Sequence, residues 1–139
     1  MENCVFCKII NNEIPSYKIY EDDLVLAFLD INPAVKGHTL VIPKKHARDI
    51  FEIEEKYLER IISVAQKISN KMKDNFNAEG VNLYHASGSA AEQSVFHFHL
   101  HIIPRRKGDN IDFTGVVSNK EAVSEEEFDG VVAKLKIEG

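Results

Sequence analysis

The stretch His97-Phe98-His99-Leu100-His101 alternates histidine with large apolar residues. In an extended strand, residues two apart point to the same face of the sheet. The stretch therefore predicts a strand with three imidazoles along one face and an apolar face packed against a core. Imidazoles can accept protons, attack electrophiles or bind a metal, so this strand is the first place to look for chemistry.

Three histidines on one face are harder to explain by packing than a single one. Burying them without partners would cost about 1–3 kcal/mol for each unmet hydrogen bond. They must therefore face a wet cleft or hold a ligand. One interpretation makes one imidazole a nucleophile that its neighbours orient. The other makes two or three of them ligands of a catalytic metal, and the spacing alone does not separate the two.

A loop of small and polar residues, 85–94, leads directly into the histidine stretch. Small residues let backbone N–H groups approach a ligand, and Ser, Gln and Gly suit contacts with phosphate. The alternative is an ordinary connection, but the position before three aligned histidines favours a binding loop. Farther upstream, the basic pair Lys44-Lys45 beside His46 is typical of a solvated strand end, and it would supply positive potential if a phosphate bound nearby.

Cys4 and Cys7 form a C-x2-C motif, which is one half of many zinc sites. Two further ligands would have to be histidines, because the chain has no other cysteine. The alternative interpretation is a short helical turn that carries two partly buried thiols. The motif alone leaves both possibilities open.

Hydrophobic periodicity predicts an α+β fold with an antiparallel sheet, one long helix and short terminal helices. Ser124 and Glu127 fit a capping box that opens a final helix through about Lys136. The long amphipathic helix is expected at residues 53–75. Besides the histidine stretch, strands are expected at residues 17–20, 24–29, 37–43 and 81–84.

Composition sets the broad class of protein. The 139 residues suit one domain, 1–139, and the charged fraction of 28% and hydrophobic fraction of 44% are those of a globular protein. The net charge of −5 argues against a general affinity for nucleic acid. No apolar run approaches the roughly 20 residues that span a bilayer, and the first residues lack the features of a signal peptide. We therefore expect a cytoplasmic protein with no membrane partner.

The sequence resembles the histidine triad (HIT) family of nucleotide hydrolases and transferases, in the branch that bears cysteines. The resemblance covers about residues 3–106, whereas the tail, 107–139, is where family members diverge. The segments that carry it are Cys4-Val5-Phe6-Cys7-Lys8-Ile9, Leu29-Asp30-Ile31-Asn32-Pro33, Gly37-His38-Thr39-Leu40-Val41-Ile42-Pro43-Lys44-Lys45-His46, Gln93-Ser94-Val95-Phe96 and His97-Phe98-His99-Leu100-His101-Ile102-Ile103.

The resemblance implies an enzyme that cleaves nucleotide conjugates through a covalent nucleotidyl-histidine. His99 would attack the α-phosphorus and His101 would contact the phosphate. Gln93 and Ser94 would help to hold the phosphate or the leaving group, with Val95 beside them. Water would then release the nucleoside monophosphate.

The resemblance also implies a nucleoside pocket and a structural metal. Asp30 would accept hydrogen bonds from the ribose, and Phe28 and Ile31 would line the base pocket, with purines the usual family preference. The implied zinc ligands are Cys4, Cys7, His46 and His97. The alternative leaves the thiols buried and the two histidines bonded to each other. A homodimer built on the long helix and an adjoining strand is also implied.

Two positions depart from the family pattern. Ala86 stands where many relatives have asparagine, which removes a polar contact unless His85 or Ser87 substitutes, and Glu92 stands where many have glycine. The leading hypothesis is a nucleoside phosphoramidase acting on adenylated conjugates. The alternatives are a dinucleoside polyphosphate hydrolase, a nucleotide sensor or partner-binding dimer with little turnover, and a metal-dependent hydrolase.

Overall fold

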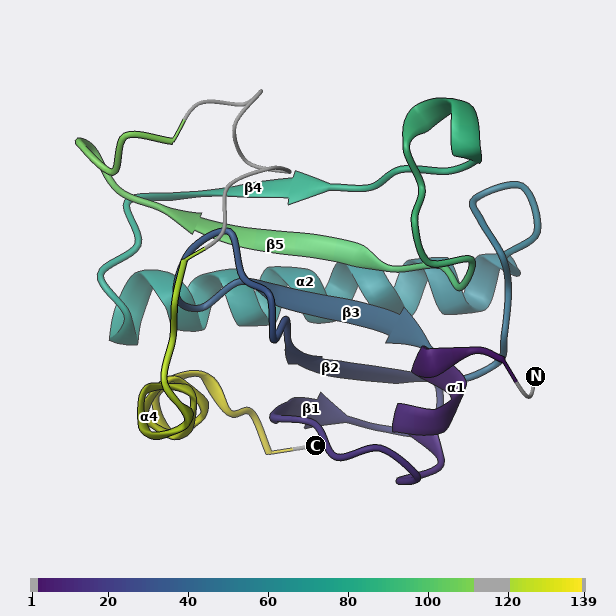
Figure 1. Cartoon of the computed structure of the whole chain (residues 1–139), viewed down its shortest axis with the longest axis horizontal. Coiled ribbons are helices and arrows are strands. Elements are labelled where there is room, and N and C mark those ends of the chain that lie inside the picture. Colours follow the sequence, from purple (N-terminus) through teal and green to yellow (C-terminus); the bar gives the residue numbers. More distant parts are fainter. Residues whose placement is uncertain (1–2, 112–120, 139) are drawn as a thin grey trace.

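In the part of the chain that the structure describes, five strands form one antiparallel sheet in the order β1-β2-β3-β5-β4, with a long helix across one face (Figure 1). The computed structural model describes residues 3–111 and 121–138. The predicted α+β class with an antiparallel sheet is confirmed. The strands are β1 Lys18–Glu21, β2 Val25–Leu29, β3 Thr39–Pro43, β4 Gly80–Tyr84 and β5 Leu100–Arg105.

The central strands are buried on both faces, which explains their nearly continuous apolar sequence. In β2, Val25 and Ala27 pack into the core beneath helix α2, Glu55–Asn75. The alternate residues Leu26 and Phe28 pack into a second cluster with helix α1, Val5–Ile10. This period of two is the one expected for a strand. The face that α1 covers only in part is where a ligand can reach the sheet.

The two longer helices follow their sequence signals. Helix α2 begins at Glu55, close to the expected start, and its buried positions are Ile61, Val64, Ala65, Ile68 and Met72. Helix α4, Glu125–Leu135, is opened by the predicted capping box between Ser124 and Glu127. The ring of Phe128 stacks on Tyr17 at 4.7 Å and fixes α4 beside the start of β1.

The prediction of one regular strand through all three histidines is wrong, because β5 begins only at Leu100. The backbone N–H of Phe98 donates to Ala47 O at 2.7 Å, in the loop that follows β3, so this part of the chain leaves the β ladder. The alternation of side chains survives. Phe98 packs into the core beneath α2, whereas His97 and His99 both contact the ring of Phe6 on the α1 side.

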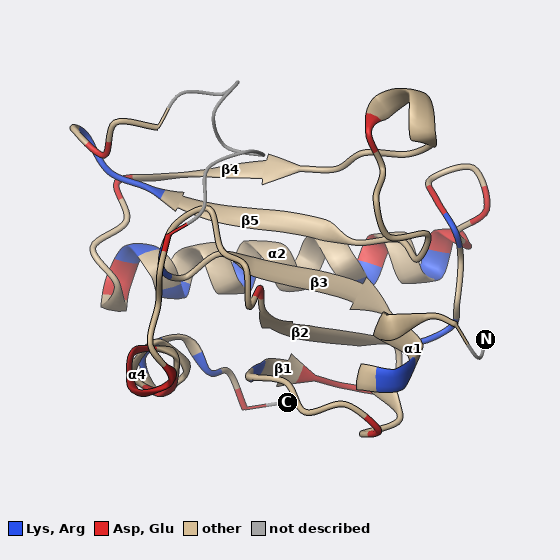
Figure 2. Ribbon diagram, in the orientation of Figure 1, with Lys and Arg blue, Asp and Glu red and all other residues tan. Residues whose placement is uncertain are grey.

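Charged residues lie mainly on α2, α4 and the connecting loops (Figure 2). Strands β2, β3 and β4 contain no Lys, Arg, Asp or Glu. Within residues 3–111 and 121–138, no helix has both the length and the hydropathy to cross a membrane. Residues 112–120, in the divergent tail, lie outside the described residues.

Candidate active site

A cavity of about 430 Å³ opens on the α1 side of the sheet, between α1, the end of β2 and the loop before β5. Ile14 and Ser16, from the loop connecting α1 to β1, also line it. All of the residues that the sequence proposed for catalysis and nucleotide binding line this one cavity. They are Phe28, Asp30, Ile31, Gln93, Ser94, Val95, His99 and His101.

The contacts of His99 define which ring nitrogen holds its proton. Its Nδ1 lies 2.8 Å from the backbone carbonyl oxygen of His97, and a carbonyl can only accept, so Nδ1 carries the hydrogen. The side chain is 8% exposed, and this burial lowers the pKa of His99. The imidazole is therefore neutral near pH 7. A neutral ring with its hydrogen on Nδ1 has a lone pair on Nε2, which is the form that a nucleophile needs.

His38 orients His101 through a second hydrogen bond. The backbone N–H of Ala34 donates to His38 Nδ1 at 2.9 Å, so the hydrogen of His38 resides on Nε2. That nitrogen lies 2.8 Å from His101 Nδ1, which accepts the bond. His101 therefore carries its own hydrogen on Nε2, where it can donate to a ligand oxygen or a leaving group.

Asp30, His38 and His101 also lie close enough together to suggest a metal site. The tautomer argues against that function. The Ala34 N–H blocks Nδ1 of His38, so binding a metal at Nε2 would require His38 to lose its last ring proton. His38 and His101 fit a hydrogen-bond relay instead, and the carboxylate of Asp30, with Oδ2 3.7 Å from His38 Nε2, places negative charge beside it.

The cavity lining includes no lysine or arginine among the described residues. The basic pair after β3 does not contribute, because Lys44 pairs with Glu21 at 2.8 Å and Lys45 pairs with Glu54. Lys45 is exposed and Lys44 is partly exposed, and both are ion-paired outside the cavity. Hydrogen bonds from histidine, serine and backbone groups are what the cavity offers to an anion.

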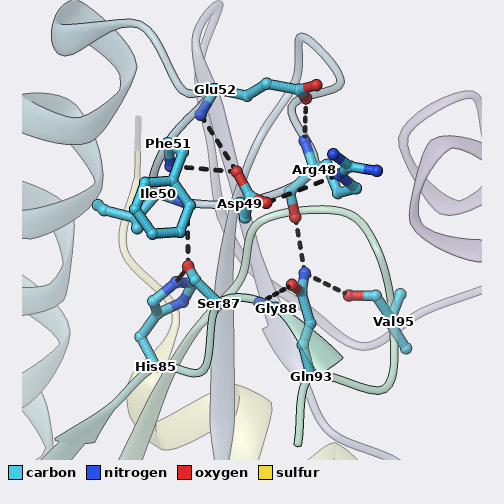
Figure 3. A network of polar contacts seen from close by, with 10 residues as sticks. All are labelled: Arg48, Asp49, Ile50, Phe51, Glu52, His85, Ser87, Gly88, Gln93 and Val95. Carbon is cyan, nitrogen blue, oxygen red and sulfur yellow. Dashed lines mark hydrogen bonds and ion pairs between the residues drawn. The ribbon is translucent and has the colours of Figure 1, made fainter. Parts of the chain in front are cut away.

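Gln93 joins two loops, although it also lines the cavity (Figure 3). Its Nε2 donates to Arg48 O at 2.6 Å and to Val95 O at 3.0 Å, and its Oε1 accepts from Gly88 N at 2.7 Å. Both amide hydrogens are thus engaged within the protein. The side chain fixes the loop that carries Ser94, and donation to a phosphate would require one of these bonds to break.

Glu92 adopts a backbone conformation that favours glycine. Its φ of 68° and ψ of 29° lie in the left-handed region, where a non-glycine residue costs roughly 1–2 kcal/mol. This is the position at which many family members have glycine. Glutamate at this position therefore carries some backbone strain, and it places a carboxylate in the lining of the cavity.

Cys4, Cys7, His46 and His97 converge beside the cavity, with one potential ligand atom each, all within 4.8 Å of one another. Cys4 Sγ lies 3.2 Å from His97 Nδ1, and Cys7 Sγ lies 3.4 Å from His46 Nδ1. The two Nδ1 atoms are 3.1 Å apart. Residues from α1, from the loop after β3 and from the histidine stretch therefore meet at one point.

Comparison with known proteins agrees with this geometry. The model of the HIT domain matches residues 11–108. The chain belongs to the HIT family. An uncharacterized HIT-like protein of Borreliella burgdorferi is 55% identical over 116 residues, which are 81% of this chain and 83% of that protein.

Two further HIT relatives have informative names. An adenosine 5′-monophosphoramidase of Candida albicans is 37% identical over 140 residues, covering 98% of this chain and 91% of that protein. A crystal structure of a zinc-bound histidine triad family protein from Mycobacterium smegmatis superimposes with a TM-score of 0.82 at 37% identity. The superposition covers 96% of both chains.

In this HIT protein the donor set of the Cys/His cluster fits zinc. His97 Nε2 donates to Pro43 O at 2.9 Å, which leaves the lone pair of Nδ1 directed at the other three groups. Burial, with the Cys4 thiol beside it, raises the pKa of Cys7 to about 11. A metal would reverse that shift, because a coordinating thiol loses its proton. Two thiolates and two imidazoles form an ordinary tetrahedral set for zinc.

Sequence reasoning missed the roles of two residues of the HIT site. His38 lies within the segment Gly37–His46 that carried the resemblance, but its pairing with His101 depends on two strands meeting side by side. Ser16 lines the cavity, and its buried hydroxyl has no hydrogen-bond partner among the described residues. No motif marked it, since a single serine after a proline is common in loops.

Lowering the pH is expected to destabilise the metal-free protein through His97. Burial lowers the pKa of this fully buried side chain from 6.5 to about 4. Between pH 6.5 and pH 4, His97 is protonated in the unfolded chain but stays neutral in the folded chain. The stability is therefore complete above pH 6.5 and falls by about 1.4 kcal/mol per unit as the pH drops toward 4.

Urea unfolding of the metal-free protein between pH 7.5 and pH 4.5 tests this expectation. His97→Gln is the matched variant, because glutamine has a similar size and does not titrate. Its free energy of unfolding should depend less steeply on pH, because the unfolded variant takes up about one proton fewer in this window than the unfolded wild type does. Equal slopes for the two proteins would contradict the assignment to His97.

Proposed function

We propose that this HIT protein is a nucleotidyl hydrolase that cleaves nucleoside phosphoramidates or related adenylated conjugates at the α-phosphorus. The observation that carries the proposal is the pair of histidine tautomers in one cavity. His99 has a free lone pair on Nε2, and His101 has a hydrogen on Nε2. Their ring centroids are 5.0 Å apart, so an attacking atom and a donor flank the same space.

The reaction proceeds in two displacements. His99 Nε2 forms a bond to the α-phosphorus while the bond from phosphorus to the leaving amine breaks. The amine departs with that electron pair and with the proton of His101 Nε2, which the attacking water replaces in the second step. The Nε2–H of His101 and the hydroxyl of Ser94 donate hydrogen bonds to the phosphoryl oxygens or the leaving group. Water then attacks the nucleotidyl-histidine, which releases the nucleoside monophosphate and restores His99.

Substrate comparison tests the proposal. The protein is incubated with an adenosine phosphoramidate and with a diadenosine polyphosphate, and AMP release is measured by chromatography. Faster release from the phosphoramidate is the expected result. Preference for the dinucleotide would identify a polyphosphate hydrolase. Tight AMP binding without release from either substrate would identify a nucleotide sensor.

Asp30 is proposed to bind the ribose, because it directly follows β2 and lines the cavity with Phe28 and Ile31. The backbone N–H of Asn32 donates to its Oδ1 at 2.8 Å and holds the carboxylate in place. Asp30→Asn should weaken AMP binding by about tenfold or more, since hydrogen bonds to a charged group contribute about 1.5–3 kcal/mol.

Calorimetric titration with AMP and with 2′,3′-dideoxy-AMP measures this effect. Wild-type protein should prefer AMP, and Asp30→Asn should bind the two nucleotides almost equally. If Asp30→Asn instead lowers the affinity for both nucleotides by the same factor, so that the preference for AMP persists, the carboxylate acts through His38 and not on the ribose hydroxyls.

We also propose that the Cys/His cluster holds a structural zinc ion. When bound, zinc would cross-link α1 to the histidine stretch and contribute no step to catalysis. His97 would then serve as a ligand, which leaves His99 and His101 for the reaction. The donor set, its tautomer and the zinc-bound relative support this division.

A cytoplasmic homodimer is the proposed working form. The exposed Leu83 lies on β4, which is an edge strand of the sheet, and Ile62 is exposed on α2. Two copies that met through these elements would cover both apolar side chains. Sedimentation of the purified protein gives its mass in solution.

A further inference from the structure

His85 reaches the backbone of the proposed nucleophile from the end of β4. Its Nδ1 lies 3.0 Å from the carbonyl oxygen of His99, and because a carbonyl only accepts, Nδ1 carries the hydrogen. The other ring nitrogen, Nε2, accepts from the hydroxyl of Ser87. Ser87 Oγ in turn accepts from the backbone N–H of Ile50 at 2.9 Å. Figure 3 shows His85, Ser87 and Ile50 in this line.

The His85 ring is also fixed by packing. It stacks on the ring of Phe98 with centroids 4.2 Å apart and 25° between the planes. Phe98 is itself anchored, because it is buried in the core beneath α2 and its N–H donates to Ala47 O. His85 thus contacts two successive residues of the histidine stretch, one through stacking and one through a hydrogen bond.

This support matters because His99 lies just before β5 and not within it. A residue in a strand is held by ladder hydrogen bonds on both sides, whereas His99 depends on local contacts. The adjacent Ala86 carries only a methyl group and can form no such bond. The imidazole of His85 provides a directed donor where Ala86 provides none.

We propose that His85 is a positioning residue for His99, and that the hydrogen bond from Ser87 fixes the orientation of the His85 ring. The inference rests on the proposed function, in which His99 Nε2 attacks phosphorus. A displacement of the nucleophile by about 1 Å can reduce a rate about 100-fold. His85 itself touches neither substrate nor phosphorus, so its loss should change kcat far more than KM.

Three variants separate the donor from the bulk of the ring. His85→Leu keeps apolar volume against Phe98 but loses the donor, and should lower kcat about 10–100-fold with KM within about twofold. His85→Asn places an amide N–H near the position of Nδ1 and should restore kcat to within about threefold of wild type. Ser87→Ala removes the partner of Nε2 and should lower kcat about threefold.

Imidazole ¹⁵N NMR supplies a readout that does not depend on turnover. Wild-type His99 should show its hydrogen on Nδ1 alone, and His85→Leu should show a mixture of both tautomers. The proposal would be overturned if His85→Leu left both kcat and the His99 tautomer unchanged. It would also be overturned if the kcat of His85→Asn fell as low as that of His85→Leu, or if Ser87→Ala kept the full wild-type kcat. A wild-type protein without turnover would instead refute the proposed function, while the NMR comparison would still test His85.

Discussion

Replacing His99 with alanine is expected to lower kcat for an adenosine phosphoramidate by about 10⁴-fold or more. Alanine removes the lone pair that forms the bond to phosphorus, and losses of this size follow removal of a catalytic nucleophile. The cavity itself should persist, since Phe28, Asp30 and Ile31 also line it and are unchanged. AMP affinity should therefore change only a few-fold.

Steady-state turnover and calorimetric AMP binding measure the two effects on the same protein. Rapid quench of the wild type in alkaline denaturant, which preserves a phosphorus–nitrogen bond, should also trap an adenylated protein for mass spectrometry, and His99→Ala should give none. The mechanism would be refuted by turnover that survives both His99→Ala and a metal chelator. Loss of activity on chelation with unchanged stability would favour a catalytic metal instead.

Purified wild-type protein is expected to hold about one zinc ion per chain, and replacing Cys4 and Cys7 together with serine should remove it. Ligand binding to the folded state contributes about 3–4 kcal/mol when zinc exceeds its Kd by 100–1,000-fold. For a domain of this size that corresponds to a fall in Tm of about 10 °C. The physical reason is that the ion cross-links α1, the loop after β3 and the histidine stretch.

Metal analysis and thermal unfolding with and without a chelator measure the zinc effect. The chelator should lower the Tm of the wild type toward that of the Cys4→Ser, Cys7→Ser variant, and it should leave the variant unchanged. Any difference in Tm that remains between the chelator-treated wild type and the variant then measures packing lost through the two serine substitutions, and not lost zinc. A wild-type Tm that does not respond to the chelator would remove the structural role for zinc.

Much of the fold could be predicted because its signals are local. The apolar run 24–29 predicts a strand buried on both faces, and β2 packs into cores on both sides. The spacing from Tyr57 to Met72 predicts α2, and the capping box predicts α4. The break in the histidine strand was not predictable, because it results from the hydrogen bond between Phe98 and Ala47, which lie 51 positions apart in the sequence.

The sequence by itself determined that three alternating histidines would share a face, and that Asp30, Gln93 and Ser94 belong with them. Only the tertiary structure assigned a different environment to each histidine. His97 donates to Pro43 O, His99 donates to its neighbour's carbonyl, and His101 accepts from His38. Two of these three partners come from distant segments of the chain. The hydrogen-bond partner of an imidazole decides which ring nitrogen carries the proton. The different roles of the three histidines therefore depend on contacts that no local sequence pattern encodes.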